Sequence, residues 1–574
     1  SNAANLTLPI FDGYSYMMMD ELLERKFEGQ NFDACTVVGN CLMISRECIN
    51  KVGGLDEIYG MGYGDETDYQ FKAMAKGFEA KVAIDTYVFH KAEMSFNSTN
   101  KKRSERLEKN RKIFFDRWGE EYNKLLKEYS KNDPIEYINN NLTSKDLKVN
   151  YDYCFVLPQM GKGTGGVIII NELTNYLNLL GHKVGMVNLY PGHYDEIQTF
   201  KPVAPENIDN LSSKYLIATI YDSVFFAEKL AQKIGSKVIY FSQGYEFLFN
   251  NGRTYEEVEI SFKLPDYVLT ISNYLKDRYK LLFGIDSAVA LNGINYDLIH
   301  QNSLEKNKNS KKKIIMNIRN EVLKGGCFLN DLVKLITVEI NNVEIHIINN
   351  TSDFTFPINN NETDEIIIHN GPIPKIKMIE LLQDANILVD ASLSEGFGLL
   401  PLEAMACGTV PVVSDSFGNR EYCVNEKNSY IIKEAHDTSK YLEKIKELLS
   451  NDKLYSAMQK EAIKTAKKFD FTDAVEKYAE VLKEIDKGKY QKNEFELSKN
   501  DLDVISNYTL SNYAYRHIVD CSINMFRNEK NSYHQIRRSN RIPNFIRIFK
   551  EFIKANLFLL KLTIKTIFNK DFRI

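Results

Sequence analysis

The sequence predicts an α/β protein with two domains built on parallel sheets. Three observations support this prediction. Short apolar strands alternate with helical segments along most of the chain, and two of the strands run into glycine-rich loops. The length of 574 residues is enough for three or four domains.

Composition excludes some classes of protein. A hydrophobic fraction of 44% and a charged fraction of 26% are typical of globular chains, and the net charge of -4 gives no overall footprint of nucleic-acid binding. The eight cysteines contain no C-x-x-C pair, so we expect core thiols in a reducing cytosol rather than a zinc site. We find neither a signal-peptide pattern nor a long uncharged apolar span, so we expect neither secretion nor membrane crossing.

The first parallel-sheet domain is predicted over residues 149–300. An apolar strand at 151–158 is followed by a glycine run that includes Gly165 and Gly166, by a helix at 167–180 and by a strand at 183–189. Strand, glycine loop, helix and strand make a βαβ unit. Further apolar strands are predicted at the following residues: 215–220, 237–241 and 267–271.

The second parallel-sheet domain is predicted over residues 311–485, after a charged connector. Its strands and closing helices are predicted at the following residues: 313–318, 344–348, 365–369 and 387–391 for strands, and 439–449 and 452–469 for helices. Before the first domain lie a block at 4–130 and a polar linker at 131–148, and after the second lies a helical extension at 486–574.

The loop from Glu395 to Gly398 carries the strongest functional pattern. It follows the buried strand at 387–391 and precedes a small-residue helix. The start of that helix offers free backbone N–H groups and a positive dipole end to an anion. Glu403, about two helical turns on, can accept hydrogen bonds from paired sugar hydroxyls. A solvated loop with two surface glutamates is the alternative, but the flanking strand and helix favour a site for a ligand that is both phosphate and sugar.

The segment EGFGLLPLEAMACGTVPVVS, with its Glu-x7-Glu spacing, resembles the donor-binding signature of retaining glycosyltransferases of GT-B fold, family 4. The resemblance covers roughly residues 150–485 and implies two Rossmann-like domains that face a cleft. It implies that Glu403 holds the ribose, and that Glu395 with the N–H groups of Phe397 and Gly398 holds the transferred sugar and phosphate. The donor-binding residues implied by the resemblance are Gly165, Gly166, Ile373, Gly396, Phe397, Gly398, Leu399 and Glu403.

Arg319 and Lys324 follow the first strand of the second domain in an Arg-x4-Lys-Gly pattern. Fixed cations aimed at a departing diphosphate lower the barrier to sugar transfer, and the family carries the same pattern. The resemblance therefore assigns the catalytic roles to Glu395, Arg319 and Lys324. It implies front-face attack in which the leaving phosphate accepts the acceptor's proton, and we expect neither a metal nor another cofactor to be required at this site.

A second candidate segment, from Tyr240 to Glu246, ends a strand of the first domain and is similar to a segment of rhamnosyl-transferring family members. Gln243 and Glu246 are candidate contacts to acceptor or sugar hydroxyls. Capping of a helix by Glu246 is an equally consistent interpretation.

The block at 4–130 resembles the carboxyl half of GT-A transferases of family 2, with Asp65 and Glu66 near the general-base position and His90 near a metal-diphosphate position. Residues 1–34 are too few for the nucleotide-binding half that such enzymes need. We therefore expect an inactive, vestigial module in which His90 is a structural histidine. It is a remnant, a truncated domain, or a scaffold or acceptor-docking part.

The tail at 537–574 contains ten Lys or Arg residues against Glu551 and Asp571. Apolar residues fill the other helical positions, which is typical of a basic amphipathic helix that binds anionic lipids. We expect a peripheral location on the inner face of the cell membrane. A helix packed on a domain or a partner is the alternative.

Together these patterns predict a retaining glycosyltransferase that moves a hexose or deoxyhexose from a nucleotide-diphosphate sugar to a cell-surface glycan or a lipid-linked acceptor. A nucleotide-sugar epimerase of GT-B fold is one alternative, and conversion of the donor without acceptor would reveal it. A catalytically silent glycan-binding scaffold is another, and it would show no nucleotide affinity.

Overall fold

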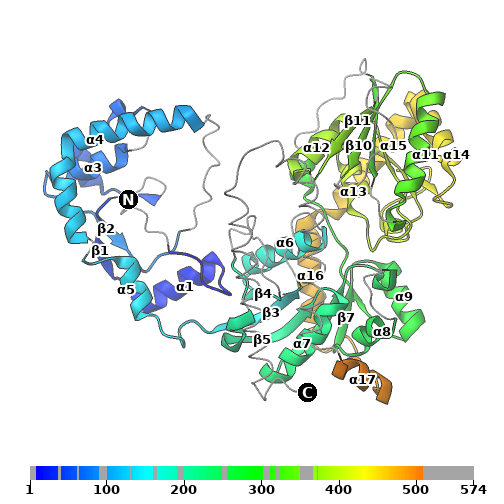
Figure 1. Cartoon of the computed structure of the whole chain (residues 1–574), viewed down its shortest axis with the longest axis horizontal. Helices are drawn as coiled ribbons and strands as arrows, with labels where there is room; N and C mark the ends of the chain where they lie inside the picture. The colour runs from blue at the N-terminus through cyan, green and yellow to red at the C-terminus, as the bar shows by residue number, and fades with distance from the viewer. Residues whose placement is uncertain are drawn as a thin grey trace, which may run out of the picture. The chain divides into compact units, whose positions relative to one another are not determined.

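The structure is a computed structural model of the whole chain (Figure 1), and it contains two compact units. The first comprises Ser1–Ile217 and Ile234–Ser236, and the second comprises Ala218–Lys233 and Lys237–Ile574. The residues that the structure describes are 8–36, 41–60, 64–88, 100–129, 131–158, 165–189, 200–203, 205–248, 255–300, 311–318, 322–349, 366–371 and 373–507.

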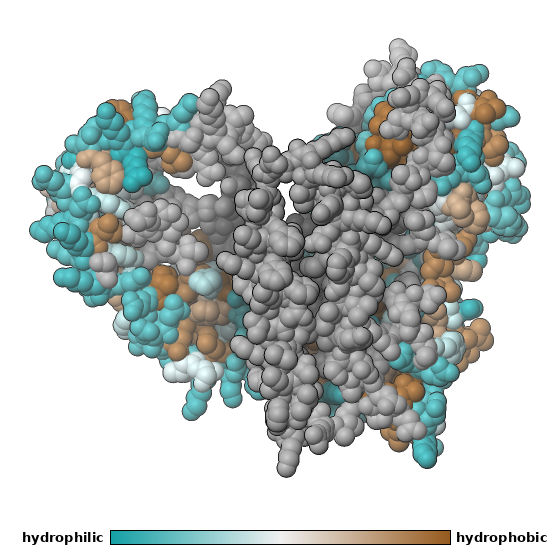
Figure 2. All heavy atoms as spheres, viewed as in Figure 1, coloured by the Kyte–Doolittle hydropathy of each residue, from teal (hydrophilic) through white to brown (hydrophobic). Residues whose placement is uncertain are grey.

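The N-terminal block consists of helices with one short antiparallel ribbon. Strands β1 (Asn31–Asp33) and β2 (Lys81–Ala83) pair in antiparallel register. The helices of the block are α1 (Tyr16–Phe27), α2 (Arg46–Val52), α3 (Asp65–Met74), α4 (Asn100–Tyr129) and α5 (Pro134–Asn141). In Figure 2, hydrophilic residues predominate on the coloured surface around α4, as its charged sequence predicts.

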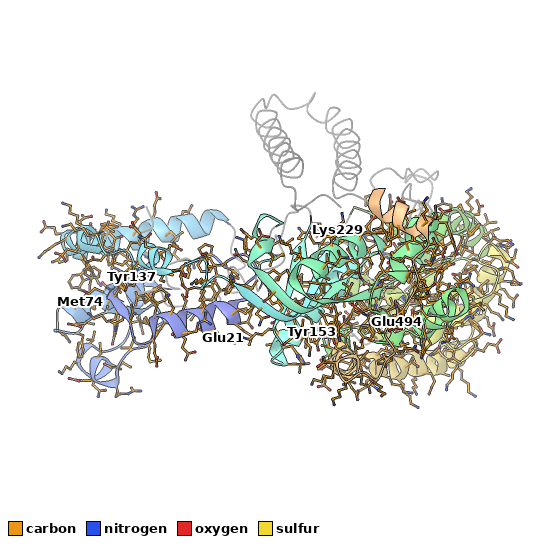
Figure 3. The ribbon with its side chains drawn as sticks, turned by 90° about the horizontal axis from the view of Figure 1, so that it is seen from below. Glu21, Met74, Tyr137, Tyr153, Lys229 and Glu494 are labelled. Atoms are coloured by element: carbon orange, nitrogen blue, oxygen red, sulfur yellow. The ribbon has the colours of Figure 1, made fainter. Side chains whose placement is uncertain are left out.

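Helix α5 lies within the stretch predicted to be a polar linker, which is therefore not an unstructured connection. Asp133 caps the helix by accepting from the N–H of Ile135 at 2.8 Å, and Pro134 occupies the first turn, where its missing N–H costs nothing. Tyr137 is labelled in Figure 3. Its ring packs 5.0 Å from that of Phe32. These contacts join the helix to the N-terminal block.

The first large sheet has six strands in the order β4-β3-β5-β6-β7-β8. The pairs β3·β4, β6·β7 and β7·β8 are parallel. Its strands are β3 (Val149–Leu157), β4 (Val184–Asn188), β5 (Leu211–Ala218), β6 (Lys237–Ser242), β7 (Tyr267–Thr270) and β8 (Ala288–Val289). The helices between them are α6 (Gly165–Leu179), α7 (Tyr221–Ile234), α8 (Tyr255–Lys263) and α9 (Asn273–Phe283).

The second large sheet has six parallel strands in the order β11-β10-β9-β12-β13-β14. Its strands are β9 (Lys312–Ile318), β10 (Val343–Asn349), β11 (Ile366–Asn370), β12 (Ile387–Asp390), β13 (Val410–Ser414) and β14 (Tyr430–Ile432). Its helices are α10 (Tyr296–His300), α11 (Gly326–Glu339), α12 (Lys375–Asp384), α13 (Leu399–Ala406), α14 (Thr438–Ser450) and α15 (Asp452–Ala466). Numbered by their order in the chain, the strands lie in the sheet as 3-2-1-4-5-6, the order of a Rossmann sheet. The chain adds strands on one side from β9 to β11 and on the other side from β12 to β14, so the strand order reverses between β9 and β12.

These two sheets confirm the predicted α/β class and the two Rossmann-like parallel sheets. The strands of the second sheet read as almost continuous Val and Ile because helices cover both faces of such sheets. On one face Ile314, Ile345 and Val389 are fully buried in a core that also contains residues of α11 and α14.

Helix α16 (Phe471–Asp486) brings the chain from the second sheet back to the first. At its start, Phe471 donates from its N–H to the carbonyl of Ile294 at 2.8 Å, and Ile294 donates from its N–H to the carbonyl of Phe469 at 2.9 Å. Along the helix, the ring of Tyr478 packs 5.3 Å from that of Phe241 in β6. Sequence analysis did not predict this return.

The last described helix, α17 (Lys499–Asn507), lies beside α8, where Asp501 is 3.6 Å from the Lys263 ammonium. The predicted basic tail at 537–574 lies outside the described residues. Among the helices that the structure describes, none has the length and apolar character needed to cross a bilayer.

Candidate functional site

The candidate site lies where the second sheet reverses direction, at the carboxyl ends of β9 and β12. Helix α13 begins after Gly398, and helix α11 begins after Gly325; both glycines have positive φ, 82° and 65°. No side chain caps the first N–H groups of either helix. Uncapped helix N-termini bind anions through these N–H groups and the helix dipole. Ligands of such sheets bind at this reversal point.

Lys324 and Glu395 meet at this edge. The Lys324 ammonium lies 2.5 Å from Oε1 of Glu395, and the two side chains are 24% and 23% exposed. The structure thus brings together two of the three predicted catalytic residues, although they are far apart in the sequence. The third, Arg319, lies outside the described residues.

Glu403 lies on α13, the helix that follows the Glu395 loop. It is 8% exposed, and its carboxylate forms an ion pair with the ammonium of Lys375, the first residue of α12. Lys375 follows the predicted donor-binding residue Ile373 by two positions. Sequence analysis missed it, although a lysine at a helix start beside that loop was a visible signal.

The backbone of the Glu395 loop is held on two sides. Glu395 donates from its N–H to the carbonyl of Ser416 at 3.0 Å, and Leu393 donates to the carbonyl of Leu323 at 2.8 Å. These bonds join the loop to the segments after β13 and β9, so the loop is fixed rather than freely solvated.

Gly396 makes the closest backbone approach of the loop. A Cβ atom there would lie 2.1 Å from the carbonyl oxygen of Gln243, so only glycine fits. The predicted sugar contact Gln243 therefore lies beside the donor loop. Phe397 is 2% exposed, with its ring 5.4 Å from that of Tyr422, so its ring anchors the loop while its backbone remains at the site.

Asp390, at the end of β12, lies behind the loop and accepts from the Ser392 N–H at 2.8 Å. Burial raises the pKa of Asp390, and the nearby Glu395 carboxylate raises it further. Sequence analysis did not single out this residue. Its carboxyl group shapes the turn that presents Glu395.

Glu246 takes the capping role that was one of its two interpretations. It is 2% exposed and accepts from the N–H of Tyr221, the first residue of α7, at 2.7 Å. Burial raises its pKa to about 8, although the Tyr240 hydroxyl and the Tyr221 N–H lower it in part. A buried carboxyl group engaged with a helix start is poorly placed to bind a sugar hydroxyl.

The glycine run of the first domain is described only at its end. Gly165 and Gly166 form the start of α6, directly after β3 and the residues 159–164, which lie outside the described part. The expected position at a strand-to-helix junction is thus observed, whereas contacts to a donor remain a prediction.

In the N-terminal block, Asp65 and Glu66 lie in the first turn of α3, and His90 lies outside the described residues. The buried acid of this helix is instead Asp68, which is 0% exposed. Asp68 accepts from the Trp118 indole at 2.9 Å and the Tyr59 hydroxyl at 3.2 Å.

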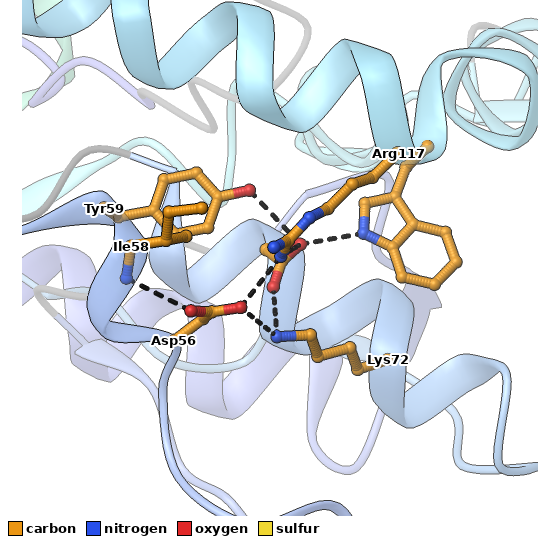
Figure 4. Close-up of polar contacts among 7 residues, drawn as sticks. Asp56, Ile58, Tyr59, Lys72 and Arg117 are labelled. Atoms are coloured by element: carbon orange, nitrogen blue, oxygen red, sulfur yellow. Dashed lines mark hydrogen bonds and ion pairs between the residues drawn. The ribbon is translucent and has the colours of Figure 1, made fainter.

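Asp68 also forms ion pairs with Lys72 at 2.7 Å and Arg117 at 3.1 Å (Figure 4). Burial raises its pKa, but the hydrogen bonds from Lys72, Trp118 and Arg117 outweigh burial and hold the pKa below the ordinary value. This network fastens α3 to α4. Within the described ranges of the chain, no group of three or more His, Cys, Asp or Glu residues is arranged to hold a metal ion.

Comparison with known proteins bears on this site. Residues 302–465, which contain all six strands of the second sheet, match the family "Glycosyl transferases group 1". The chain is 32% identical over 106 residues to D-inositol 3-phosphate glycosyltransferase 1 of Catenulispora acidiphila, covering 18% of this chain and 25% of that protein. It is 31% identical over 112 residues to D-inositol 3-phosphate glycosyltransferase of Acidothermus cellulolyticus, covering 20% of this chain and 25% of that protein.

Among solved structures, Anabaena Alr3699/HepE in complex with UDP-glucose is 13% identical with a TM-score of 0.46, covering 58% of this chain and 99% of that one. The sucrose-phosphate synthase of Thermosynechococcus elongatus is 14% identical with a TM-score of 0.47, over the same shares. The chain spans about a quarter of the length of the curated relatives it matches. The second sheet therefore lies within a segment that is similar to glycosyl transferases of group 1, and the activity of the whole protein is a matter for proposal.

Proposed function

We propose that this protein is a retaining glycosyltransferase of the GT-B type, family 4, which moves a hexose or deoxyhexose from a nucleotide-diphosphate sugar to a cell-surface glycan or lipid-linked acceptor. The observation that carries the proposal is the Lys324–Glu395 pair beside two uncapped helix N-termini, with buried Glu403 on the same loop and helix. A diphosphate is bound by a cation and by free N–H groups, and the hydroxyls of a sugar and of a ribose are bound by carboxylates.

Each group has a distinct role in this proposal. Lys324, with Arg319, stabilises the negative charge that grows on the departing diphosphate, and the N–H groups at the start of α13 do the same from the other side. Glu395 orients the transferred sugar, while Glu403 accepts from the ribose hydroxyls. The departing phosphate takes the acceptor's proton. Cations and helix ends supply the positive charge, so the proposal requires no metal.

The acceptor and the location of the protein complete the proposal. The composition of the tail at 537–574 supports a peripheral position on the inner face of the cell membrane, where lipid-linked acceptors are found. We propose that the N-terminal block takes no part in the chemistry, because Asp68, the buried acid of α3, is engaged in packing that helix against α4.

The test is donor binding. We would measure thermal shifts and calorimetric affinities for UDP, UDP-glucose, GDP-mannose and dTDP-rhamnose, and we expect at least one nucleotide sugar to stabilise the protein. Glu403→Ala should remove that stabilisation. Glu380→Ala, on α12 in an exposed pair with Lys377, is the matched control and should keep it.

Three outcomes would contradict the proposal. Stabilisation that requires a metal and survives Arg319→Ala would place the site elsewhere. Conversion of a donor to its epimer without acceptor would indicate an epimerase, and absence of all nucleotide affinity would indicate a glycan-binding scaffold.

A further inference from the structure

Two guanidinium groups lie over aromatic rings in segments next to the Glu395 loop. The guanidinium of Arg278 lies 5.1 Å from the ring centre of Tyr245, and that of Arg420 lies 5.0 Å from the ring centre of Phe417. The ring of Tyr274 stacks on Phe417, with centres 5.0 Å apart and planes at 13°. We call these five residues the aromatic row.

The row lies next to the predicted position of the transferred sugar. Burial raises the pKa of Tyr274, and Ser394, the residue before Glu395, lowers that pKa in part, so Ser394 lies close to the Tyr274 hydroxyl. Phe417 forms an isolated parallel bridge with Glu395 itself. A molecule that contacts the row therefore lies within reach of a sugar held by Glu395.

Phe417 is held in an unusual conformation. Its φ of 67° is in the left-handed region, which residues other than glycine rarely adopt, and its ring is 36% exposed. Glu421 fixes the segment by accepting from the N–H of Asn273 at 2.6 Å and from its amide at 3.0 Å. Strained backbone conformations of this kind are concentrated at ligand sites, because contacts with the surrounding structure must offset their conformational energy.

The two arginines of the row differ in their partners. Arg420 makes two hydrogen bonds to the Asp415 carboxylate, at 2.6 and 2.7 Å, so its charge is already neutralised. Arg278 is exposed on α9, and no carboxylate of the described residues forms an ion pair with it. A planar guanidinium oriented by an aromatic ring, with its N–H groups unoccupied by a carboxylate, is suited to bind phosphate or carboxylate.

We propose that the aromatic row is an acceptor subsite for a saccharide that carries an oxyanion, either phosphate or carboxylate. The Tyr274 ring and the exposed part of Phe417 that Tyr274 and Arg420 leave uncovered contact the apolar C–H surface of the sugar, and Arg278 binds the anion. The inference rests on the proposed function, because it assigns the second substrate of the same site.

The test uses glucose 6-phosphate, glucuronate and glucose as probes, titrated into the full chain with and without UDP and followed by saturation-transfer NMR. We expect the two anionic sugars to bind more tightly than glucose. Arg278→Gln should weaken them by about tenfold or more, the effect of losing a hydrogen bond to a charged group. UDP affinity should not change.

Two further variants separate charge from geometry. Lys280→Gln removes an exposed cation from the same helix and should leave all three affinities unchanged. Phe417→Gly relieves the positive φ, since glycine adopts it freely, and should weaken charged and neutral sugars alike. The anionic probe that binds with the higher affinity identifies the anion as phosphate or carboxylate.

Equal binding of glucose and the anionic sugars would overturn the proposal, as would equal losses from Arg278→Gln and Lys280→Gln. UDP binding without any sugar binding would overturn it too, while leaving the proposed function intact. Sugar binding that depends on Arg278 in a protein without UDP affinity would support the subsite and contradict the proposed donor site.

Discussion

Lys324 follows β9, and its ammonium pairs with the Glu395 carboxylate at the carboxyl end of the second sheet. We expect Lys324→Met to weaken UDP binding by about tenfold or more, because a hydrogen bond to a charged group contributes about 1.5–3 kcal/mol. Isothermal titration with UDP measures this. Lys334→Met, on α11 in an exposed pair with Asp331, should bind UDP normally. An unchanged affinity in the Lys324 variant would remove this residue from the site.

Glu246 should make stability depend on pH. Its native pKa of about 8 is above the ordinary 4.5, so the native state holds a proton that the unfolded chain releases. This contribution is complete below pH 4.5 and is lost as pH rises through 8. The Glu246→Gln variant has no carboxyl group at this position to titrate, so it does not lose this stability as pH rises. Its amide oxygen can still accept from the Tyr221 N–H.

We therefore expect the melting temperature of Glu246→Gln, relative to the wild type, to rise from pH 5 to pH 8 and then level off. Differential scanning fluorimetry across this range measures the change. Glu228, whose pKa burial also raises to about 8, is present in both proteins and cancels. Glu256→Gln, at an exposed position on α8, should give a difference that does not vary with pH.

The sequence was sufficient to predict which residues of the Glu395 loop matter, because strand, glycine turn and helix start are adjacent in the chain. It did not indicate that Lys375 would neutralise Glu403, since the two lie on different helices and meet only after folding. Nor did it indicate the positive φ of Phe417, because the strain depends on tertiary contacts from Tyr274 and Glu421.

At the scale of elements, the contact of the Glu395 loop with the end of β6 leaves no space for a side chain at Gly396. We expect Gly396→Ala to destabilise the protein by about 1–3 kcal/mol, as overpacking usually does, and to lower donor affinity because the loop must move. Thermal melts and UDP titration test this. Gly54→Ala is the control, since no atom lies within 4 Å of its added methyl group. Equal melts for the two variants would contradict the close approach.

The packing of α3 on α4 depends on Asp68. Among the described residues, Asp68→Asn leaves Asp56 as the remaining charged partner of Arg117 and Lys72, and we expect a loss of about 1–3 kcal/mol in the stability of this block. Limited proteolysis should then cleave the N-terminal block faster while sparing the second sheet. Glu47→Gln, in an exposed pair with Lys51, should not change the cleavage rate.

For the molecule as a whole, the basic tail predicts binding to anionic membranes. We expect the full chain to sediment with vesicles that contain phosphatidylglycerol, and to do so less as salt increases, because exposed charges are screened. Removal of residues 537–574 should abolish the effect, and neutral phosphatidylcholine vesicles should bind neither form. Equal binding by the full and shortened chains would contradict a lipid role for the tail.

The overall architecture followed from the sequence where the signal was local. Apolar strands and glycine loops predicted both parallel sheets, as the 3-2-1-4-5-6 order of the second sheet confirms. Helix α5 was missed because Asp133 and Pro134 start it inside a stretch rich in asparagine. The return of α16 was missed because its partner Phe241 lies more than 200 residues earlier.

That return has a consequence for any attempt to divide the protein. Ile294 and Asp470 form a backbone bridge, so the chain leaves the first sheet and comes back to it at one point. The two halves are therefore interleaved rather than consecutive. A fragment that stops at residue 465 would keep the whole second sheet yet strip Tyr478 from Phe241 in the first. A chimaera that exchanges the donor half between relatives should therefore be joined at two positions, near residues 300 and 470, and not at one.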